Sequence, residues 1–203
     1  MTEEQVSTEK LILEAARKVF IEKGYDGARM QEIAEEAGIN KALLHYYFRN
    51  KDKLFESIFN DAFSKFMPQV VQAMGSDLPF DQKIRTFINN YIDLIQENPH
   101  IPLFVLHELQ RDPQRLINIF KSYGFSPQAF APVLQRQLEE SGYRPIPFFH
   151  LITNIIGMCI FPFVARPIIQ GFILGGSEEA YRAYLSERKE IVYDFVMNSI
   201  RVK

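Results

Sequence analysis

The chain has 203 residues, of which 47% are hydrophobic, and its formal net charge is −2. This length and composition suit one medium globular domain, or a small domain joined to a larger one. The charge gives no global sign of nucleic-acid binding, so such a function must rest on a local basic patch. One cysteine excludes an intramolecular disulfide framework, and we expect a cytoplasmic protein without a cleavable signal because the chain begins with polar and acidic residues.

The first expected element is an amphipathic helix that begins at Ser7 or Thr8 and ends at Gly24. We expect the residues before it to be frayed. A second helix is expected to start at Ala28 or Arg29. The apolar face of the first helix has helical spacing and consists of Ile12, Ala15, Ala16, Val19 and Phe20.

A short helix, a tight turn and another short helix are predicted between Met30 and Phe48. Gly38 favours the end of the first of these helices, because glycine readily takes the positive φ found there. Asn40 is a favoured N-cap for the next helix, residues 41–47. Three residues share an apolar stripe on the first helix: Ile33, Ala34 and Ala37.

The second short helix is unusual in the side chains that it leaves outside. Leu44 and Phe48 are four residues apart and are expected to point inward. Lysine and tyrosine can reach phosphate oxygens, alanine permits a close approach, and histidine can bond a base edge or a phosphate. The outward residues are therefore candidate contacts to double-stranded DNA: Lys41, Ala42, His45 and Tyr46, with Leu43 as a contact to a thymine methyl group.

A local basic patch follows this helix, with Arg49, Lys51 and Lys53 around a single aspartate. Lys51 begins another helix, whose backbone amides also favour a phosphate. Taken one at a time, these features fit an ordinary helical hairpin with a charged, solvated face. Taken together, they predict a helix-turn-helix that binds DNA, in which Asn40 caps the reading helix.

The segment IAEEAGINKALLHYYFRNKDKLF resembles the DNA-binding signature of the tetracycline-repressor (TetR) family of bacterial regulators. The resemblance extends upstream through ILEAARKVFIEKGYDGARM and covers roughly residues 8 to 60. It implies that Arg29 contacts a phosphate, although a solvated surface arginine is an equal alternative. His45 stands where the family usually has tyrosine, and Leu43 where it often has threonine or serine, so the base preference at these positions stays open.

The rest of the chain reads as helices separated by prolines. A helix from Asn50 to about Met67 is expected to break or kink at Pro68, and the resemblance makes it the connection between two domains. Helices are expected over residues 80–96, 101–110, 113–123 and 127–140, and a last helix after Ser177. Residues 148–165 carry no charge; a buried helix is favoured over a membrane span because His150 and Asn154 lie inside this segment.

These patterns predict an all-α chain of about nine helices. Residues 1–53 form a helix-turn-helix DNA-binding domain and residues 54–203 a ligand-binding and dimerisation domain. The two long C-terminal helices have spare apolar faces, and the resemblance likewise implies a homodimer through them. Two reading helices related by a two-fold axis would bind a palindromic operator with half-sites about 34 Å apart or a multiple of that distance.

The second domain is rich in aromatic residues and methionine. Each such residue alone is more often part of a core, but together they could line a pocket for a small hydrophobic or aromatic effector. Arg166 could pair with an anionic ligand or with a carboxylate such as Glu108. The candidate ligand-binding residues are Phe66, Phe87, Tyr91, Phe104, His107, Phe120, Tyr123, Asn154 and Arg166.

We therefore expect a repressor that leaves its operator when an effector binds and the connecting helix shifts. A ligand that promotes DNA binding is the alternative direction. The second class of function is a helical carrier or interaction protein with a non-functional helix-turn-helix. The four histidines lack metal-ligand spacing, Cys159 has apolar neighbours and no catalytic motif is present, so we expect no enzyme, no metal and no cofactor.

Overall fold

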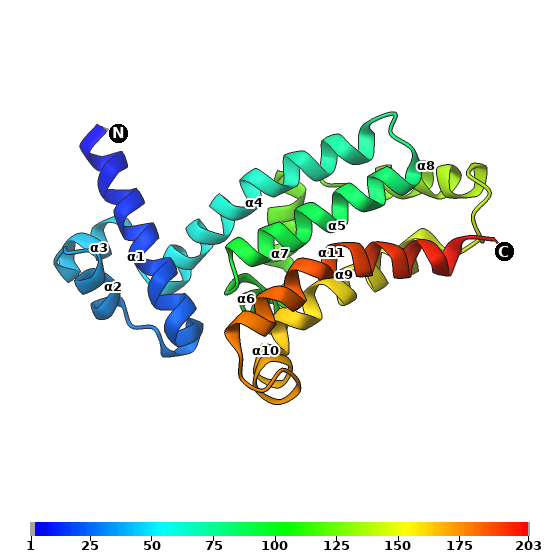
Figure 1. Ribbon diagram of the computed structural model, residues 1–203. Coiled ribbons are helices and arrows are strands. Elements are labelled where there is room, and N and C mark those ends of the chain that lie inside the picture. Colours follow the sequence, from blue (N-terminus) through cyan, green and yellow to red (C-terminus); the bar gives the residue numbers. More distant parts are fainter. Residues whose placement is uncertain (1–2, 203) are drawn as a thin grey trace.

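The computed structural model describes residues 3–202, apart from the side chains of residues 3–7, Phe104, His107 and Arg111. This described part contains helices and no strand, so the predicted all-α class is confirmed (Figure 1). The helices are α1 (Glu3–Gly27), α2 (Met30–Glu36), α3 (Lys41–Tyr47), α4 (Lys51–Gly75), α5 (Phe80–Glu97), α6 (Ile101–Arg111), α7 (Pro113–Ser122), α8 (Pro127–Glu140), α9 (Phe148–Val164), α10 (Arg166–Ile168), the π-helical turn η1 (Ile169–Ile173) and α11 (Glu178–Ile200).

The helices form two groups along an elongated molecule, and α4 runs from one group to the other (Figure 1). At one end, α1, α2 and α3 make a small bundle that closes on the first turns of α4. Phe20 of α1 and Phe55 of α4 are fully buried there, with ring centroids 4.9 Å apart in an edge-to-face arrangement. At the other end, α5 packs against α4, α9 and α11. The larger group, which α5 to α11 form around the rest of α4, is called the regulatory bundle, after the role that the resemblance implies.

The first helix begins earlier than the sequence suggested. We expected a start at Ser7 or Thr8, whereas α1 starts at Glu3. No glycine or proline precedes Ser7, and the early acidic residues suit the positive end of the helix dipole. The expected end at Gly24 is confirmed, because Gly24 has a φ of 69° and a further short turn then runs to Gly27.

Pro68 does not end the connecting helix. The expected break is wrong, because α4 continues through Pro68 to Gly75. Proline removes the N–H group that would bond the carbonyl of Ser64. Both residues lie on the exposed side of α4, where water can satisfy that carbonyl, while Met67 and Val70 on the other side stay buried.

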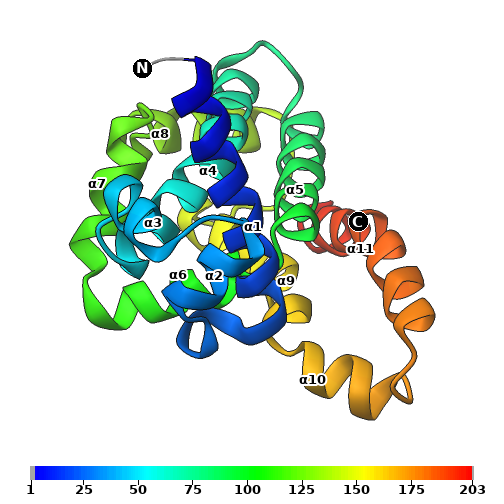
Figure 2. The same cartoon turned by 90° about the vertical axis from the view of Figure 1, so that its left-hand side faces the viewer.

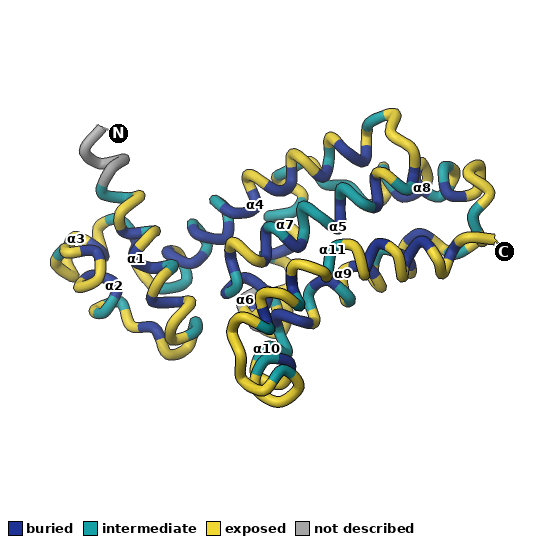
Figure 3. Tube along the Cα trace, in the orientation of Figure 1, coloured by how far each residue is buried: buried dark blue, intermediate teal, exposed yellow. Residues whose placement is uncertain are grey.

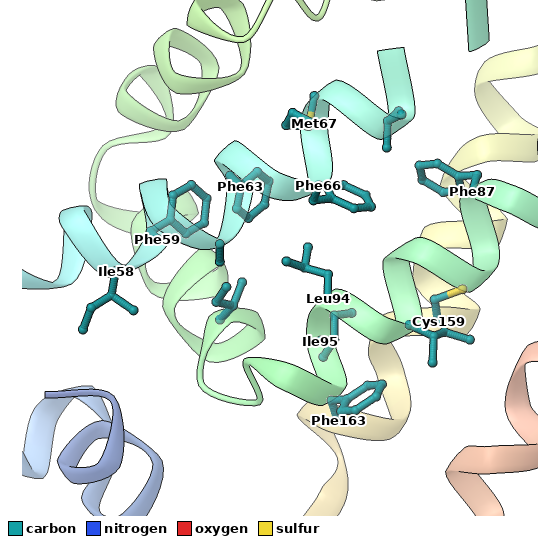
Figure 4. Close-up of a cluster of buried hydrophobic side chains, with 14 of the residues drawn as sticks. Ile58, Phe59, Phe63, Phe66, Met67, Phe87, Leu94, Ile95, Cys159 and Phe163 are labelled. Carbon is teal, nitrogen blue, oxygen red and sulfur yellow. The ribbon is translucent and has the colours of Figure 1, made fainter. Parts of the chain in front are cut away.

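The regulatory bundle encloses a core of stacked aromatic rings (Figure 4). Phe59 and Phe63 of α4 stack with ring centroids 4.1 Å apart, and the side chains of α5 and α9 close the cluster. Five helices of this bundle, α5 to α9, begin and end within about two residues of the expected bounds. The loop between α9 and α11, with α10 and η1, was not expected and projects away from the other helices (Figures 1 and 2).

No single helix within residues 3–202 is both long enough and apolar enough to cross a membrane. The uncharged segment that raised this alternative forms α9. The pair that α9 forms with Arg166–Ile173 has the length and apolar composition of a membrane span, but its two parts are bent by 59°.

Candidate nucleic-acid interface

The turn between α2 and α3 is fixed by hydrogen bonds within a few residues. Gly38 has a φ of 65°, and the N–H of Ile39 donates to the carbonyl of Ala34 over 3.0 Å. The side chain of Asn40 accepts from the N–H of Leu43 at 2.8 Å, which confirms it as the N-cap of α3. These bonds hold α3 at a defined angle to α2.

The inward and outward faces of α3 are those that the spacing predicted. Leu44 is fully buried, and Phe48 just after α3 is 5% exposed. Figure 3 shows the exposed residues of α3 at the outer end of the molecule. The ring of Tyr46 is 74% exposed. The exposed residues on or beside α3 are Asn40, Lys41, Ala42, Leu43, His45, Tyr46 and Arg49.

The side chain of His45 makes a contact that the sequence did not reveal. Its Nδ1 lies 3.1 Å from the carbonyl oxygen of Arg49, a residue just after the end of α3. The next helix starts with a second asparagine cap, because the side chain of Asn50 accepts from the N–H of Lys53 at 2.8 Å. Side-chain contacts therefore hold the segment after α3 as well as the segment before it.

The ammonium group of Lys51 is bound within the protein and does not project freely into solvent. Its ammonium group donates to the carbonyls of Tyr25 at 2.7 Å and Ala28 at 3.1 Å, and it lies 4.5 Å from the centre of the Tyr25 ring. Its side chain thus ties the α1–α2 connection to α4, and what Lys51 offers to a phosphate is its backbone N–H at the start of α4. Arg29 is exposed at the N-cap of α2, and its DNA contact stays a prediction.

Comparison with known proteins identifies this arrangement. Residues 12–58 match the model of the bacterial regulatory proteins of the tetR family. This stretch includes α2, α3 and the first turns of α4, so the helix-turn-helix is similar to that of the TetR family of bacterial regulatory proteins.

Two curated relatives from Bacillus subtilis are the uncharacterized HTH-type transcriptional regulator YhgD and the probable HTH-type transcriptional regulator YttP. YhgD is 32% identical over 116 residues. The aligned region covers 57% of this chain and 53% of YhgD, so the chain spans about half the length of that relative. YttP is 23% identical over 191 residues, 91% of this chain and 92% of that relative. Among solved structures, that of AibR in complex with isovaleryl coenzyme A and operator DNA has a TM-score of 0.62 and 23% identity, and it covers 77% of this chain and 85% of AibR. The likeness to AibR shows that the two chains share a fold.

Five of the candidate ligand-binding residues lie in or beside the aromatic core. The rings of Phe66 and Phe87 each lie 5.7 Å from that of Tyr91, and Phe120 lies 5.6 Å from Phe63. The hydroxyl of Tyr123 donates to the carbonyl of Asn60 in α4 at 2.9 Å. Burial raises the pKa of Tyr91, so its hydroxyl stays protonated and can serve as a hydrogen-bond donor in apolar surroundings.

The remaining candidates do not join this cluster. Asn154 lies exposed on the outer side of α9, and Arg166 bonds Gln170 at 2.7 Å and Glu178 at 2.6 Å near the projecting loop. Asn154 lines a groove between α9 and α11 instead of the aromatic core, so its role in ligand binding stays a prediction. Of the two alternatives for Arg166, pairing with a carboxylate is the one seen, and the carboxylate is that of Glu178, not Glu108. The side chains of Phe104 and His107 lie outside the described residues.

Glu108 instead belongs to a set of ion pairs that the sequence gave no sign of. Arg115 of α7 contacts Glu108 of α6 at 3.2 Å and Glu56 of α4 at 2.8 Å. Burial opposes ionisation of Glu56, but hydrogen bonds from Lys53 and Arg115 hold its pKa below the usual range. One guanidinium group thus joins α6 and α7 to the part of α4 nearest the reading helix.

Proposed function

We propose that this protein is a transcriptional regulator that binds a palindromic operator as a homodimer and leaves it when a small hydrophobic or aromatic effector binds. The observation that carries the proposal is the exposed face of α3, on which Lys41 and Tyr46 point outward from a doubly capped helix-turn-helix. AibR, which shares the fold, is found with both a small molecule and operator DNA, and this supports the same pair of partners here.

The outer side of α9 and α11 supports the homodimer. Phe149 and Phe161 of α9 and Phe195 of α11 are 55 to 66% exposed, which is unusual for large aromatic side chains. Between the two helices lies a groove of about 610 Å³, lined in part by Gly157 and Phe195. A surface with both projecting rings and a groove can be complementary to itself, as a two-fold interface requires.

The ion pairs of Arg115 supply a route from an effector to the DNA. An effector held among Phe66, Phe87 and Tyr91 would have to part α4 from α5, because these rings now pack on one another. Glu56 lies toward the DNA end of the same helix, so its pair with Arg115 would pass a change in α6 and α7 directly to α4.

Selection of bound duplexes from a random DNA pool, at a fixed moderate salt concentration, tests the DNA-binding part. The protein should recover a palindrome, and Lys41→Ala combined with Tyr46→Ala should lose it while the far-UV circular dichroism stays unchanged. Lys121→Ala, on the exposed side of α7, is the matched control and should bind as before. Binding that depends on salt alone, with no recovered motif, would instead point to a carrier that has kept the fold.

The release step is tested with the recovered duplex and a panel of ligands that includes isovaleryl coenzyme A, hydrophobic carboxylates and aromatic compounds. A ligand that lowers operator affinity identifies the effector. Arg115→Met should then keep operator binding and ligand binding but lose most of the coupling between them. Arg136→Met, on the exposed side of α8, is the control. Equal coupling in both variants would refute the route through Arg115.

A further inference from the structure

The contact of His45 fixes which of its two ring nitrogens carries the proton. A carbonyl oxygen can only accept a hydrogen bond, so Nδ1 must donate to the carbonyl of Arg49, 3.1 Å away. A neutral imidazole has a single N–H group. In neutral His45 the other nitrogen, Nε2, is therefore an acceptor, and it lies at the tip of an exposed side chain on the outward face of α3.

An acceptor at this position limits what His45 can bond on a duplex. Phosphate oxygens are themselves acceptors, so neutral His45 has no hydrogen to offer them. In the major groove, the donors are the exocyclic amino groups, N6 of adenine and N4 of cytosine. Each base pair carries one such group, on one strand or the other.

We propose that His45 reads an exocyclic amino group in the major groove, and so selects adenine or cytosine over guanine or thymine on one strand of each half-site. This proposal rests on operator binding as proposed above. A tyrosine at this position could donate to a phosphate, whereas the neutral histidine gives up that contact for a base preference.

Neighbouring residues favour a base over a phosphate as the partner of His45. Lys41 at the start of α3 and Arg49 just after its end are both exposed and can donate to phosphates. A phosphate contact by His45 would need a second proton on its ring, because Nε2 of the neutral ring is an acceptor. Ala42, on the same outward face, lets the backbone of α3 approach the base edges.

The state of the ring is tested first on the free, full-length protein labelled with 15N-histidine. The resonance of His45 is identified by its absence in His45→Phe. In slightly alkaline solution we expect a neutral ring protonated at Nδ1, whereas a free histidine prefers Nε2. A proton on Nε2 would overturn the proposal without touching the proposed operator binding.

The base preference is tested by duplex selection with the wild type, His45→Phe and Arg49→Ala. The wild type should recover adenine or cytosine at one position of each half-site, and His45→Phe should lose this preference and bind the selected duplex roughly tenfold more weakly. Arg49→Ala keeps the carbonyl that accepts from Nδ1, so it should keep the base preference, lose affinity evenly across sequences and show a smaller salt dependence.

A modified duplex separates the amino group from the rest of the base. If adenine is selected, its replacement by purine, which lacks the 6-amino group, should cost the wild type about tenfold and His45→Phe nothing. If cytosine is selected, its replacement by pyrimidin-2-one, which lacks the 4-amino group, serves the same purpose. Equal losses in both proteins, or an unchanged motif in His45→Phe, would overturn the proposal. If the wild type recovers no motif at all, the proposed operator binding fails, and this reading role fails with it whatever the ring state.

Discussion

The small bundle that presents α3 and the regulatory bundle are held together in different ways. In the small bundle, the turn geometry depends on bonds between residues at most five apart, such as that from the N–H of Leu43 to Asn40 and that from Ile39 to Ala34. In the regulatory bundle, the deciding contacts join distant residues, as Arg115 joins Glu56 and Lys83 joins Gln137. The turn that presents α3 is therefore specified locally, whereas the regulatory bundle depends on how complete helices pack.

The largest expected effect is a loss of packing in the regulatory bundle. Phe59 is fully buried and stacks on Phe63, so Phe59→Ala should lower the free energy of unfolding by roughly 3–5 kcal/mol. Chemical denaturation monitored by circular dichroism measures this loss. Phe172→Ala is the control, because that ring is 86% exposed, and it should change stability by less than about 0.5 kcal/mol. Similar losses in the two variants would show that the core is not closed around Phe59.

The next effect concerns His100, which lies where the two regions meet. Its ring packs edge-on against Phe55, and neither nitrogen has a hydrogen-bond partner among the described residues. Burial, helped by the nearby Arg17, lowers the pKa of His100 from 6.5 to about 4. The unfolded chain therefore binds a proton at a higher pH than the folded chain. The contribution of His100 to the free energy of unfolding should fall as the pH drops below 6.5 and level off below about 4, with a loss from this residue of roughly 3 kcal/mol.

His100→Leu removes this proton linkage and fills the same space. The variant should be at least as stable as the wild type at pH 7.5, because an unpartnered buried polar group is lost, and its advantage should grow as the pH falls to 4. Thermal unfolding at several pH values measures the difference between the two proteins. His150→Leu, at an exposed position on α9, is the control. Parallel pH profiles for His100→Leu and the wild type would contradict the assigned pKa.

The smallest expected effect on stability is in the small bundle. Asn40→Ala removes the N-cap of α3 and should cost about 1 kcal/mol. Operator affinity should fall by more than this loss of stability explains, since α3 loses its fixed direction toward the DNA. Asn40→Asp can still accept from the N–H of Leu43 and should be nearly as stable as the wild type. If Asn40→Ala and Asn40→Asp bind the recovered duplex equally well, the cap has no part in presenting α3.

The same contrast explains what the sequence could and could not predict. The bounds of α3, its cap at Asn40 and its buried Leu44 all follow from rules that act within one turn of helix, and all are confirmed. The continuation of α4 through Pro68 could not be foreseen, because it depends on which side of the helix faces water.

The site residues show the same division. The core position of Phe66, Phe87 and Tyr91 followed from helical spacing in two helices. The placement of Arg166 could not be derived in this way, since its partner Glu178 lies beyond a loop that the sequence did not reveal as structured. The contact of Arg115 with Glu56 joins residues 59 positions apart, a separation at which sequence spacing carries no information.

Lys83 fixes the C-terminal end of α4 in place. Its buried ammonium group donates to the carbonyl of Met74 and to the side chain of Gln137, both at 3.0 Å, and so fastens the last turn of α4 to α5 and α8. With this end fixed, the 25 residues of α4 form a lever about 37 Å long. A rotation of roughly 5° about the fastened end would move the other end by about 3 Å, close to the rise of one base pair. A displacement that barely disturbs the packing around Lys83 would thus be enough to shift α3 from one base pair to the next.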